Sequence, residues 1–293
     1  MPREPWRVSL HGGHSGEFCE HATGTLREVL ESALAAGYDV FGVSEHAPRS
    51  EARFIYQTEL DKGYDLKRIQ DEFESYASAV RELADEFSDR LTILRGFEAE
   101  IVPEATFQED MLGHRKRHDF EFMVGSVHYV NELSVDGPKE DFERMVESCG
   151  GLEEAAVRYY GNVVRLVEAL QPEVVGHLDL IRRNAPPEAV LNTPRIQVAA
   201  DQALEAVRAA DAILDLNTAG WRKGLGTPYP EPWLVQRAHT MGIGFCFGDD
   251  SHGRDVGEGI DEARVYLLKN GVDKIRRLTR VDHQIVKEWV DLQ

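Results

Sequence analysis

The chain has 293 residues with 42% hydrophobic side chains, and 52 acidic residues outnumber 33 basic ones to give a formal net charge of −19. This length and composition allow one large hydrophobic core, and the acidic balance disfavours nucleic acid or an anionic membrane as a partner. With neither an N-terminal apolar segment nor a run of eighteen apolar residues, we expect no signal peptide or membrane span. We therefore expect a single domain over residues 1–293, located in the cytoplasm.

The three cysteines, Cys19, Cys149 and Cys246, are widely spaced and form no CxxC pair. This pattern argues against both a disulfide framework and a thiolate zinc site, and it fits a reducing compartment. We expect Cys19 and Cys246 to pack in the core rather than bind metal.

The chain opens with a short apolar run at residues 6–10, followed by three imidazoles, His11, His14 and His21. The run predicts a strand, and the Gly12–Gly13 pair allows the backbone to turn so that the side chains converge. One histidine at a strand end is usually an ordinary polar residue. Three within eleven residues point to a metal site, provided that later strand ends supply further ligands.

Apolar strand patterns alternate with helical patterns along the rest of the chain. The predicted strands span residues 39–44, 91–97, 120–127, 172–176, 212–216 and 244–248. The predicted helices span residues 25–36, 66–87, 152–170, 194–209 and 231–241, and a polar stretch occupies 131–151. No repeat or flexible linker divides this alternation, which is typical of parallel strands joined by helices. We therefore predict an α/β fold in which a parallel sheet closes into a barrel.

Side chains that can bind metal follow six of the seven predicted strands. Because parallel barrels place their chemistry at the carboxyl ends of the strands, these side chains should converge at one end of the barrel. With the opening histidines they give nine candidate metal ligands: His11, His14, His21, His46, Glu98, His128, His177, Asp250 and His252. His114 and His118 lie instead in a basic polar segment, and we expect them to be solvated.

Nine ligands exceed the needs of one tetrahedral ion and suggest two or three divalent ions. Imidazole with carboxylate favours zinc, iron or manganese over calcium, and the lack of thiolates favours a catalytic site with open positions. Clustered divalent ions lower the pKa of a bridging water and neutralise charge on phosphoryl oxygens, so phosphate ester hydrolysis fits best. The expected partner is a small phosphorylated substrate, and the oligomeric state stays open.

Seven motifs occur in a fixed order along the chain. They are the histidine-rich opening with FCEHA at 18–22, SEHAP at 44–48, GFEAE at 96–100, GSVHY at 125–129, GHLDL at 176–180, NTAG at 217–220 and GDDSH at 248–252. This series resembles the PHP (polymerase and histidinol phosphatase) family over nearly the whole chain. The motifs at 125–129, 176–180 and 217–220 resemble its histidinol-phosphate phosphatase branch.

The resemblance implies a distorted seven-stranded, TIM-like (β/α)7 barrel with three metal ions at the carboxyl ends of the strands. By motif, the first ion would be held by His11, His14, Glu98 and Asp250, the second by Glu98, His128 and His177, and the third by His21, His46 and His252. The family usually opens with His-x-His, whereas this chain has two glycines between His11 and His14. We expect a glycine bulge to restore their convergence.

The resemblance also implies a metal-dependent phosphomonoesterase that hydrolyses L-histidinol phosphate through a metal-bridging hydroxide, with Glu98, Asp250 and His252 as catalytic residues. Shared metal ligands do not select a leaving group, so another small phosphate ester, a nucleotide or a phosphodiester remains an alternative substrate. A metal-binding module without catalytic activity is a further alternative.

Four basic residues on loops at the predicted active end are candidates for binding the substrate phosphate: Arg182, Arg183, Arg222 and Lys223. Replacing Arg222 by alanine is expected to lower kcat/KM and to leave the metal content intact. Two acidic residues are expected to support neighbouring ligands, Asp179 by orienting His177 and Asp249 in a similar way near Asp250.

Overall fold

The computed structural model describes residues 4–282 and 284–293, and a seven-stranded parallel sheet forms its centre, in the order β1-β2-β3-β4-β7-β8-β9. These strands are β1 (Val8–Ser9), β2 (Val40–His46), β3 (Thr92–Ala99), β4 (Phe122–Gly125), β7 (Val174–Val175), β8 (Ile213–Asn217) and β9 (Phe245–Gly248). Leu10 N–H donates to Phe247 O across 2.9 Å, so the chain after β1 lies beside β9. The sheet thus curls into a nearly closed barrel, and the predicted α/β barrel is confirmed.

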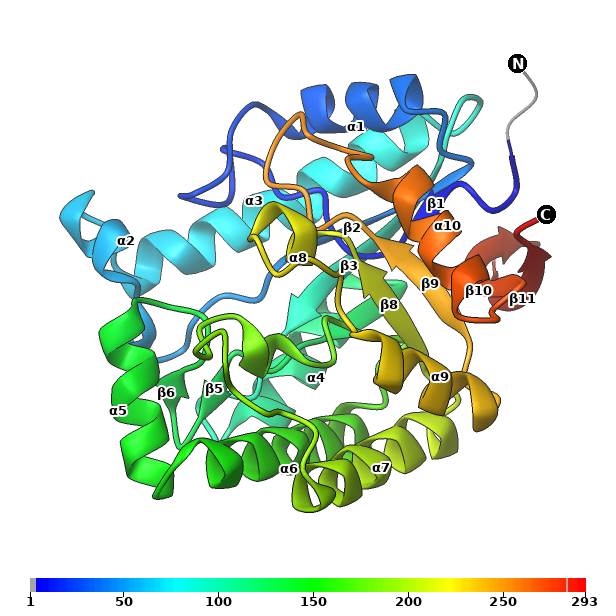
Figure 1. The fold of residues 1–293 in the computed structure, drawn as a ribbon. Coiled ribbons are helices and arrows are strands. Elements are labelled where there is room, and N and C mark those ends of the chain that lie inside the picture. Colours follow the sequence, from blue (N-terminus) through cyan, green and yellow to red (C-terminus); the bar gives the residue numbers. More distant parts are fainter. Residues whose placement is uncertain (1–3, 283) are drawn as a thin grey trace.

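Helices surround the barrel, with α1 and α3 on one side and α6 and α7 side by side on the opposite side (Figure 1). The helices are α1 (Leu26–Ala35), α2 (Gln57–Asp61), α3 (Leu66–Glu86), α4 (Phe107–His118), α5 (Lys139–Cys149), α6 (Leu152–Leu170), α7 (Pro194–Ala209), α8 (Ala219–Arg222), α9 (Pro232–Thr240) and α10 (Ile260–Lys269). Thr25 and Glu28 form the predicted capping box before α1, because each side chain accepts a hydrogen bond from the other residue's backbone N–H.

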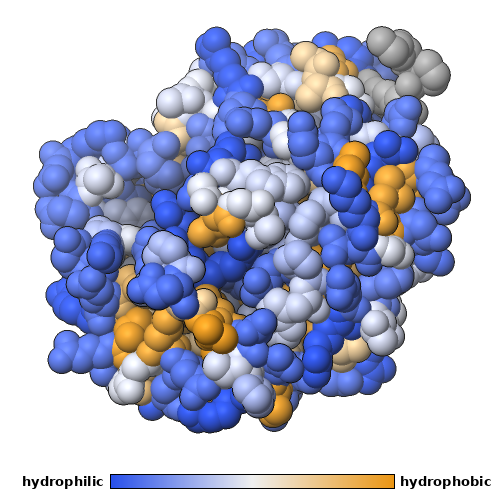
Figure 2. Space-filling model, viewed as in Figure 1, coloured by the Kyte–Doolittle hydropathy of each residue, from blue (hydrophilic) through white to orange (hydrophobic). Residues whose placement is uncertain are grey.

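The core is one continuous cluster of buried apolar side chains that fills the barrel and the layer beneath the helices. Strand β2 is buried along nearly its whole length, as expected for a parallel strand covered on both faces. Glycine is required where the Phe122 ring crosses neighbouring strands, because a Cβ on Gly96 would lie only 2.3 Å from that ring. The face of the molecule seen in Figure 2 is mostly hydrophilic, with apolar side chains in a few separate patches.

A C-terminal hairpin that the sequence did not predict covers the amino-terminal end of the barrel strands. It consists of β10 (Lys274–Val281) and β11 (Gln284–Asp291), paired antiparallel. Arginines of β10 bind carboxylates just before barrel strands: Arg276 binds Asp211 before β8, Arg277 binds Asp39 before β2, and Arg280 binds Glu121 before β4. The hairpin therefore lies opposite the end at which the candidate ligands follow their strands.

The polar stretch 131–151, for which no element was predicted, holds part of the short hairpin β5 (Tyr129–Val130) and β6 (Leu133–Ser134) and then α5. One other expectation was wrong. His118 is buried rather than solvated. The centroid of its ring lies 5.6 Å from that of Phe73 and 5.5 Å from that of Phe120. Its basic segment forms the last turns of α4, and that helix turns one face toward the aromatic side chains of the core. Among the described residues, no helix combines the length and apolarity that crossing a membrane requires.

Candidate metal centre

The buried carboxylate of Glu98, near the end of β3, lies at the centre of the candidate site. Its Oε1 lies 3.1 Å from His11 Nε2 and 3.2 Å from His177 Nε2. Its Oε2 lies 2.8 Å from His46 Nδ1, and His128 Nε2 is 3.7 Å from Oε1. These four imidazoles come from the ends of β1, β2, β4 and β7, so closure of the barrel brings them to one carboxylate.

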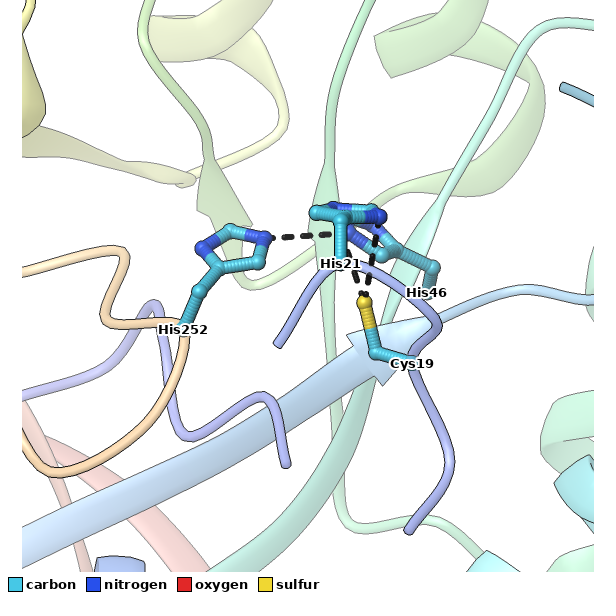
Figure 3. A group of neighbouring side chains, drawn as sticks. All are labelled: Cys19, His21, His46 and His252. Carbon is cyan, nitrogen blue, oxygen red and sulfur yellow. Dashed lines mark hydrogen bonds between the residues drawn. The ribbon is translucent and has the colours of Figure 1, made fainter. Parts of the chain in front are cut away.

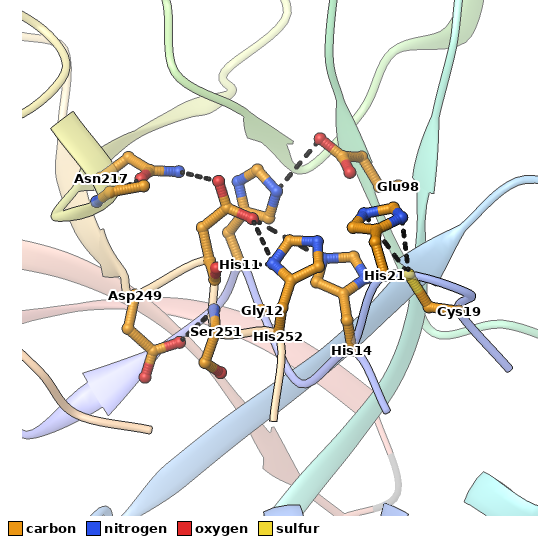
Figure 4. A network of polar contacts seen from close by, with 12 residues as sticks. His11, Gly12, His14, Cys19, His21, Glu98, Asn217, Asp249, Ser251 and His252 are labelled. Atoms are coloured by element: carbon orange, nitrogen blue, oxygen red, sulfur yellow. Dashed lines mark hydrogen bonds and ion pairs between the residues drawn. The ribbon is translucent and has the colours of Figure 1, made fainter. Parts of the chain in front are cut away.

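His14 and Asp250 extend this cluster toward β9. His14 Nε2 lies 3.7 Å from Asp250 Oδ1. The His14 ring is stacked on both His46 and His252, with ring centroids 4.2 Å apart in each pair. Figure 4 shows the rings of His11, His14 and His252 gathered beside Glu98.

The Gly12–Gly13 pair explains how His11 and His14 converge although two residues separate them. Both glycines have positive φ, +145° and +82°, and a Cβ on Gly12 would lie 2.4 Å from Asp249 Oδ1. Ring nitrogens of His11 and His14 lie within 4.8 Å of each other and of a Glu98 oxygen. The extra glycine therefore does not separate the two imidazoles.

His21, His46 and His252 form an outer group. His46 Nε2 lies 3.4 Å from His252 Nε2, and the rings of His21 and His252 have centroids 4.8 Å apart. Cys19, which we expected only to pack, belongs to the same group, because its Sγ lies 3.4 Å from His21 Nδ1. Figure 3 shows the thiol and the three rings turned toward one another.

Several buried polar atoms at the centre fit a role in binding cations. His14 Nε2 and His177 Nδ1 make no hydrogen bond within the described part of the chain, and Glu98 Oε2 has the His46 ring nitrogen beside it, 2.8 Å away. Leaving a buried polar atom unpaired costs about 1–3 kcal/mol. Metal ions would provide partners for such nitrogen and oxygen atoms, so the residues present fit a centre with more than one ion.

Charge and burial together set the protonation of the ligands. Burial raises the pKa of Glu98, but the surrounding imidazoles, first of all His11, outweigh it and hold that pKa well below its usual range. Burial lowers the pKa of His128, but Glu100 and Glu98 outweigh it and raise that pKa to about 10. Burial and neighbouring imidazoles lower the pKa of His21 to about 3. The His21 ring is therefore neutral near pH 7, which is the form that binds metal.

Three carboxylates that sequence reasoning missed hold ligand imidazoles in place. Asp215 Oδ2 lies 2.6 Å from His11 Nδ1, Glu45 Oε1 lies 3.0 Å from His14 Nδ1, and Glu100 Oε2 lies 2.7 Å from His128 Nδ1. A carboxylate on Nδ1 fixes the ring orientation and leaves Nε2 to face the ion. A signal was present for Asp215 and Glu45, because a charged residue inside an apolar strand is rarely buried without a partner.

Asp179 and Asp249, which the sequence analysis expected to orient neighbouring ligands, have other roles in the structure. Asp179 Oδ2 accepts a hydrogen bond from Glu231 N–H across 2.9 Å and lies 2.8 Å from Arg182 Nε, so it anchors that loop and not the His177 ring. Asp249 accepts hydrogen bonds from the Tyr38 hydroxyl and from Gly257 N–H, at 2.9 and 2.8 Å. It thereby braces the loop that carries Asp250 and His252.

A cavity of about 640 Å³ lies over the cluster. Its lining includes seven of the nine candidate ligands, namely His21, His46, Glu98, His128, His177, Asp250 and His252. His11 and His14 are fully buried. Water and a small substrate can therefore reach one side of the centre, while the other side is closed by the protein.

Of the four cations predicted to bind substrate, Lys223 is the one found among the described residues that line this cavity. Arg222 instead donates to the carbonyl of Asp250 across 3.0 Å and to Thr218 Oγ1 across 3.1 Å. Arg182 binds Asp179 and donates to Thr227 Oγ1 across 2.8 Å. Arg183 is half-buried outside the cavity lining.

A family model described as the PHP domain matches residues 10–219, which is more than two thirds of the chain. The chain belongs to the PHP-domain family. The matched part of this PHP chain contains the candidate ligands from His11 to His177 and ends before Asp250 and His252. These last two ligands join the PHP centre because β9 closes the barrel beside β1.

Three proteins that are similar to this PHP chain are named histidinol phosphatases. A Schizosaccharomyces pombe protein named "Probable histidinol-phosphatase" is 31% identical over 275 residues, covering 92% of this chain and 88% of its own length. A Listeria monocytogenes structure named a "putative histidinol phosphatase" has a TM-score of 0.76 and 26% identity, covering 87% of this chain and 99% of its own. The structure of a Lactococcus lactis histidinol phosphate phosphatase, complexed with zinc, L-histidinol and phosphate, shares the fold with a TM-score of 0.72 at 20% identity, covering 96% of this chain and 99% of its own.

Asp215 offers a test of how the PHP centre is supported. Asp215→Asn should weaken metal affinity by about 10–100-fold, the range for losing a group that orients a ligand, because the amide lacks the charge that faces His11 Nδ1. Competition with a chelator would measure this change. Asp211→Asn is the matched control, since Asp211 is exposed and paired with Arg276 at the far end of the barrel. Equal affinities for the two variants would contradict the orienting role.

Proposed function

We propose that this PHP protein is a metal-dependent phosphomonoesterase that hydrolyses L-histidinol phosphate to L-histidinol and phosphate. The observation that carries the proposal is the convergence of seven imidazoles and the carboxylates of Glu98 and Asp250 beneath one cavity. The S. pombe relative named for this activity supports it, and so does the L. lactis structure that contains L-histidinol and phosphate.

The proposed cofactor is two or three divalent transition metal ions, zinc, iron or manganese, held by the nine candidate ligands. When bound, such ions lower the pKa of a water and neutralise charge that develops on phosphoryl oxygens. Glu98, Asp250 and His252 are the proposed catalytic residues, because all three line the cavity. In the reaction the water oxygen bonds to phosphorus, the ester P–O bond breaks, and the histidinol oxygen takes up a proton.

The rest of the cavity suits the organic part of this substrate. Aromatic rings of Phe54, Tyr56 and Tyr129 line it, and so does the carboxylate of Asp136, while the Glu132 carboxylate is paired with Arg53. Carboxylates attract the ammonium group of histidinol phosphate, and aromatic faces suit its imidazole ring. A nucleotide, with several negative charges and no ammonium group, fits this lining less well.

The choice of substrate can be tested on the metal-reconstituted protein. We expect kcat/KM for histidinol phosphate to exceed, by at least about tenfold, that for an amino alcohol phosphate that keeps the ammonium group and lacks the imidazole, the scale of about 1.4 kcal/mol. A nucleoside monophosphate and a phosphodiester complete the panel. A higher kcat/KM on either of these would replace the proposed substrate, and no hydrolysis of any ester would favour a metal-binding module.

Lys223 is the proposed cation for the substrate phosphate. Lys223→Ala should lower kcat/KM by about 10–100-fold and leave the metal content unchanged, because a charge-assisted hydrogen bond contributes about 1.5–3 kcal/mol. Lys269→Ala, an exposed lysine on α10, is the control. Full kcat/KM after Lys223→Ala would show that the phosphate is bound without this side chain. Arg222→Ala should instead disturb the metal content, because Arg222 holds the Asp250 carbonyl.

Three wider expectations belong to the same proposal. The small phosphorylated substrate is the proposed partner. We infer that residues 1–293 act as a single PHP-type barrel unit, supported by the one continuous apolar cluster. A cytoplasmic location is supported by the free thiols of Cys19, Cys149 and Cys246.

A further inference from the structure

We propose that Arg49 is a positioning residue for substrate specificity, because it holds the Tyr56 ring in place as the part of the cavity wall that packs against the ring of the substrate. The inference rests on the proposed function and deepens it, since it names the support for a preference for histidinol phosphate over an ester without a ring. Arg49 acts through Tyr56 and does not touch the substrate itself.

The three aromatic rings that line the cavity are not held equally. Phe54 and Tyr129 are 4% and 7% exposed and pack edge to face, with ring centroids 5.5 Å apart. Close packing in the core therefore fixes these two rings. Tyr56 is only half-buried, and it lies in residues 47–65, where a short 3-10 turn and the five-residue α2 are the regular structure. Its ring needs a support other than the core.

The guanidinium of Arg49 provides this support. It lies over the Tyr56 ring, with its Cζ 4.1 Å from the ring centroid. Arg49 Nη1 donates to Glu59 Oε1 across 2.8 Å, and Glu59 Oε2 accepts a hydrogen bond from the Tyr56 N–H across 2.8 Å. The guanidinium and the carboxylate thus hold the ring and the backbone of Tyr56 at the same time.

Burial separates Arg49 from an ordinary loop arginine. Its side chain is 14% exposed and that of Glu59 is 5% exposed, and burying a charge is costly unless it is paired. Arg49 is not among the described residues that line the 640 Å³ cavity. It lines instead two small cavities of about 20 and 30 Å³, whose linings also include His46. This position suits a support for the wall and not a ligand for the substrate phosphate.

A fixed Tyr56 ring matters only for a substrate that packs against it. An aromatic face suits the imidazole of histidinol phosphate, and a wall that is ordered before binding spares the cost of ordering it when the substrate binds. The metal centre and Lys223 would act on the phosphate, which every phosphomonoester carries. Loss of Arg49 should therefore raise KM for esters with a ring, while kcat and the metal content stay near wild type.

Arg49→Met, which removes the charge and the planar guanidinium, tests this role. We expect KM for histidinol phosphate and for phenyl phosphate to rise by about 3–10-fold, the scale for ordering one side chain. KM for ethanolamine phosphate, which has no ring, should stay near wild type. Arg68→Met is the matched control, because Arg68 is 46% exposed, lies over the Tyr64 ring at 3.6 Å and binds Glu72 at 2.8 Å. It should leave all three KM values unchanged.

A double-mutant cycle separates positioning from a general structural effect. If Arg49 acts through Tyr56, Arg49→Met should change KM little once Tyr56→Leu has removed the ring. A rise of the same size in the Tyr56→Leu background would overturn the inference. An equal loss of kcat/KM on all three esters, or no change on any of them, would overturn it as well.

Arg49→Lys decides the matter if Arg49→Met does not fold. Lysine keeps a charge to face Glu59 but lacks the planar group that stacks on the ring, so KM should rise for the same two esters, and wild-type values for both would overturn the inference. Wild-type protein that prefers ethanolamine phosphate would refute histidinol phosphate as the substrate, and phenyl phosphate would still test Arg49. Wild-type protein that hydrolyses none of the three would refute the phosphatase, and the role of Arg49 would fall with it.

Discussion

Glu98→Gln is expected to abolish hydrolysis of histidinol phosphate, with kcat at least about a thousandfold lower, and to reduce the metal content. The carboxylate faces His11, His46 and His177 at 2.8–3.2 Å, so the amide removes the charge that the metal ions share. Loss of metal support for the transition state is worth several kcal/mol, and about 4 kcal/mol corresponds to a thousandfold in rate. Elemental analysis and steady-state kinetics on the same preparation would measure both effects.

Glu86→Gln is the control for this change. Glu86 lies at the end of α3, is half-exposed and pairs with Arg27 on the surface, and exposed pairs contribute little to stability. Its kcat and metal content should stay near wild type. Full metal content in Glu98→Gln, with kcat within tenfold of wild type, would remove Glu98 from the centre of the mechanism.

His11→Ala and His14→Ala should each lower hydrolysis by at least about a hundredfold, the upper end of the scale for disturbed metal support. His11 faces Glu98 and His14 faces Asp250. Each substitution therefore removes one imidazole neighbour from one of these carboxylates. The measurement is kcat/KM together with metal stoichiometry for each variant.

His239→Ala is the matched control, because His239 is exposed on α9 and should affect neither quantity. Near-normal activity in one of the two test variants would identify that histidine as a bystander. The ion would then be held by the other histidine with Glu98 and Asp250. Gly12 and Gly13 would be needed only to let the backbone turn.

The barrel and its ligands could be predicted because both depend on local order along the chain. Each apolar strand pattern is followed by its own ligand, as His46 follows β2 and His177 follows β7, and parallel strands end together. The C-terminal hairpin lacked such a signal. Its buried residues Ile275 and Leu278 are three positions apart rather than two, and arginines stand between them.

The support of the ligands could not be predicted, because it depends on which strands become neighbours. Asp215 reaches His11 only when the barrel closes, 204 positions apart in sequence. The position of a residue on a loop likewise does not predict where its long side chain points. Arg222 contacts backbone carbonyls, whereas Lys223 lines the cavity. Cys19 was expected to pack in the core, and it is buried, but the fold also brings it beside three imidazoles that its place in the sequence did not indicate.

The β10–β11 hairpin has a practical consequence for handling the protein. The chain ends at the base of the barrel, where Leu292 is buried and its N–H donates to Asp273 O across 2.8 Å. An affinity tag or surface attachment at the C-terminus would therefore sit on the side away from the cavity, and immobilised protein would keep its open end toward the solution. A linker should leave Leu292 in place, since a fusion that replaced it would lose the packing of this side chain in the apolar core.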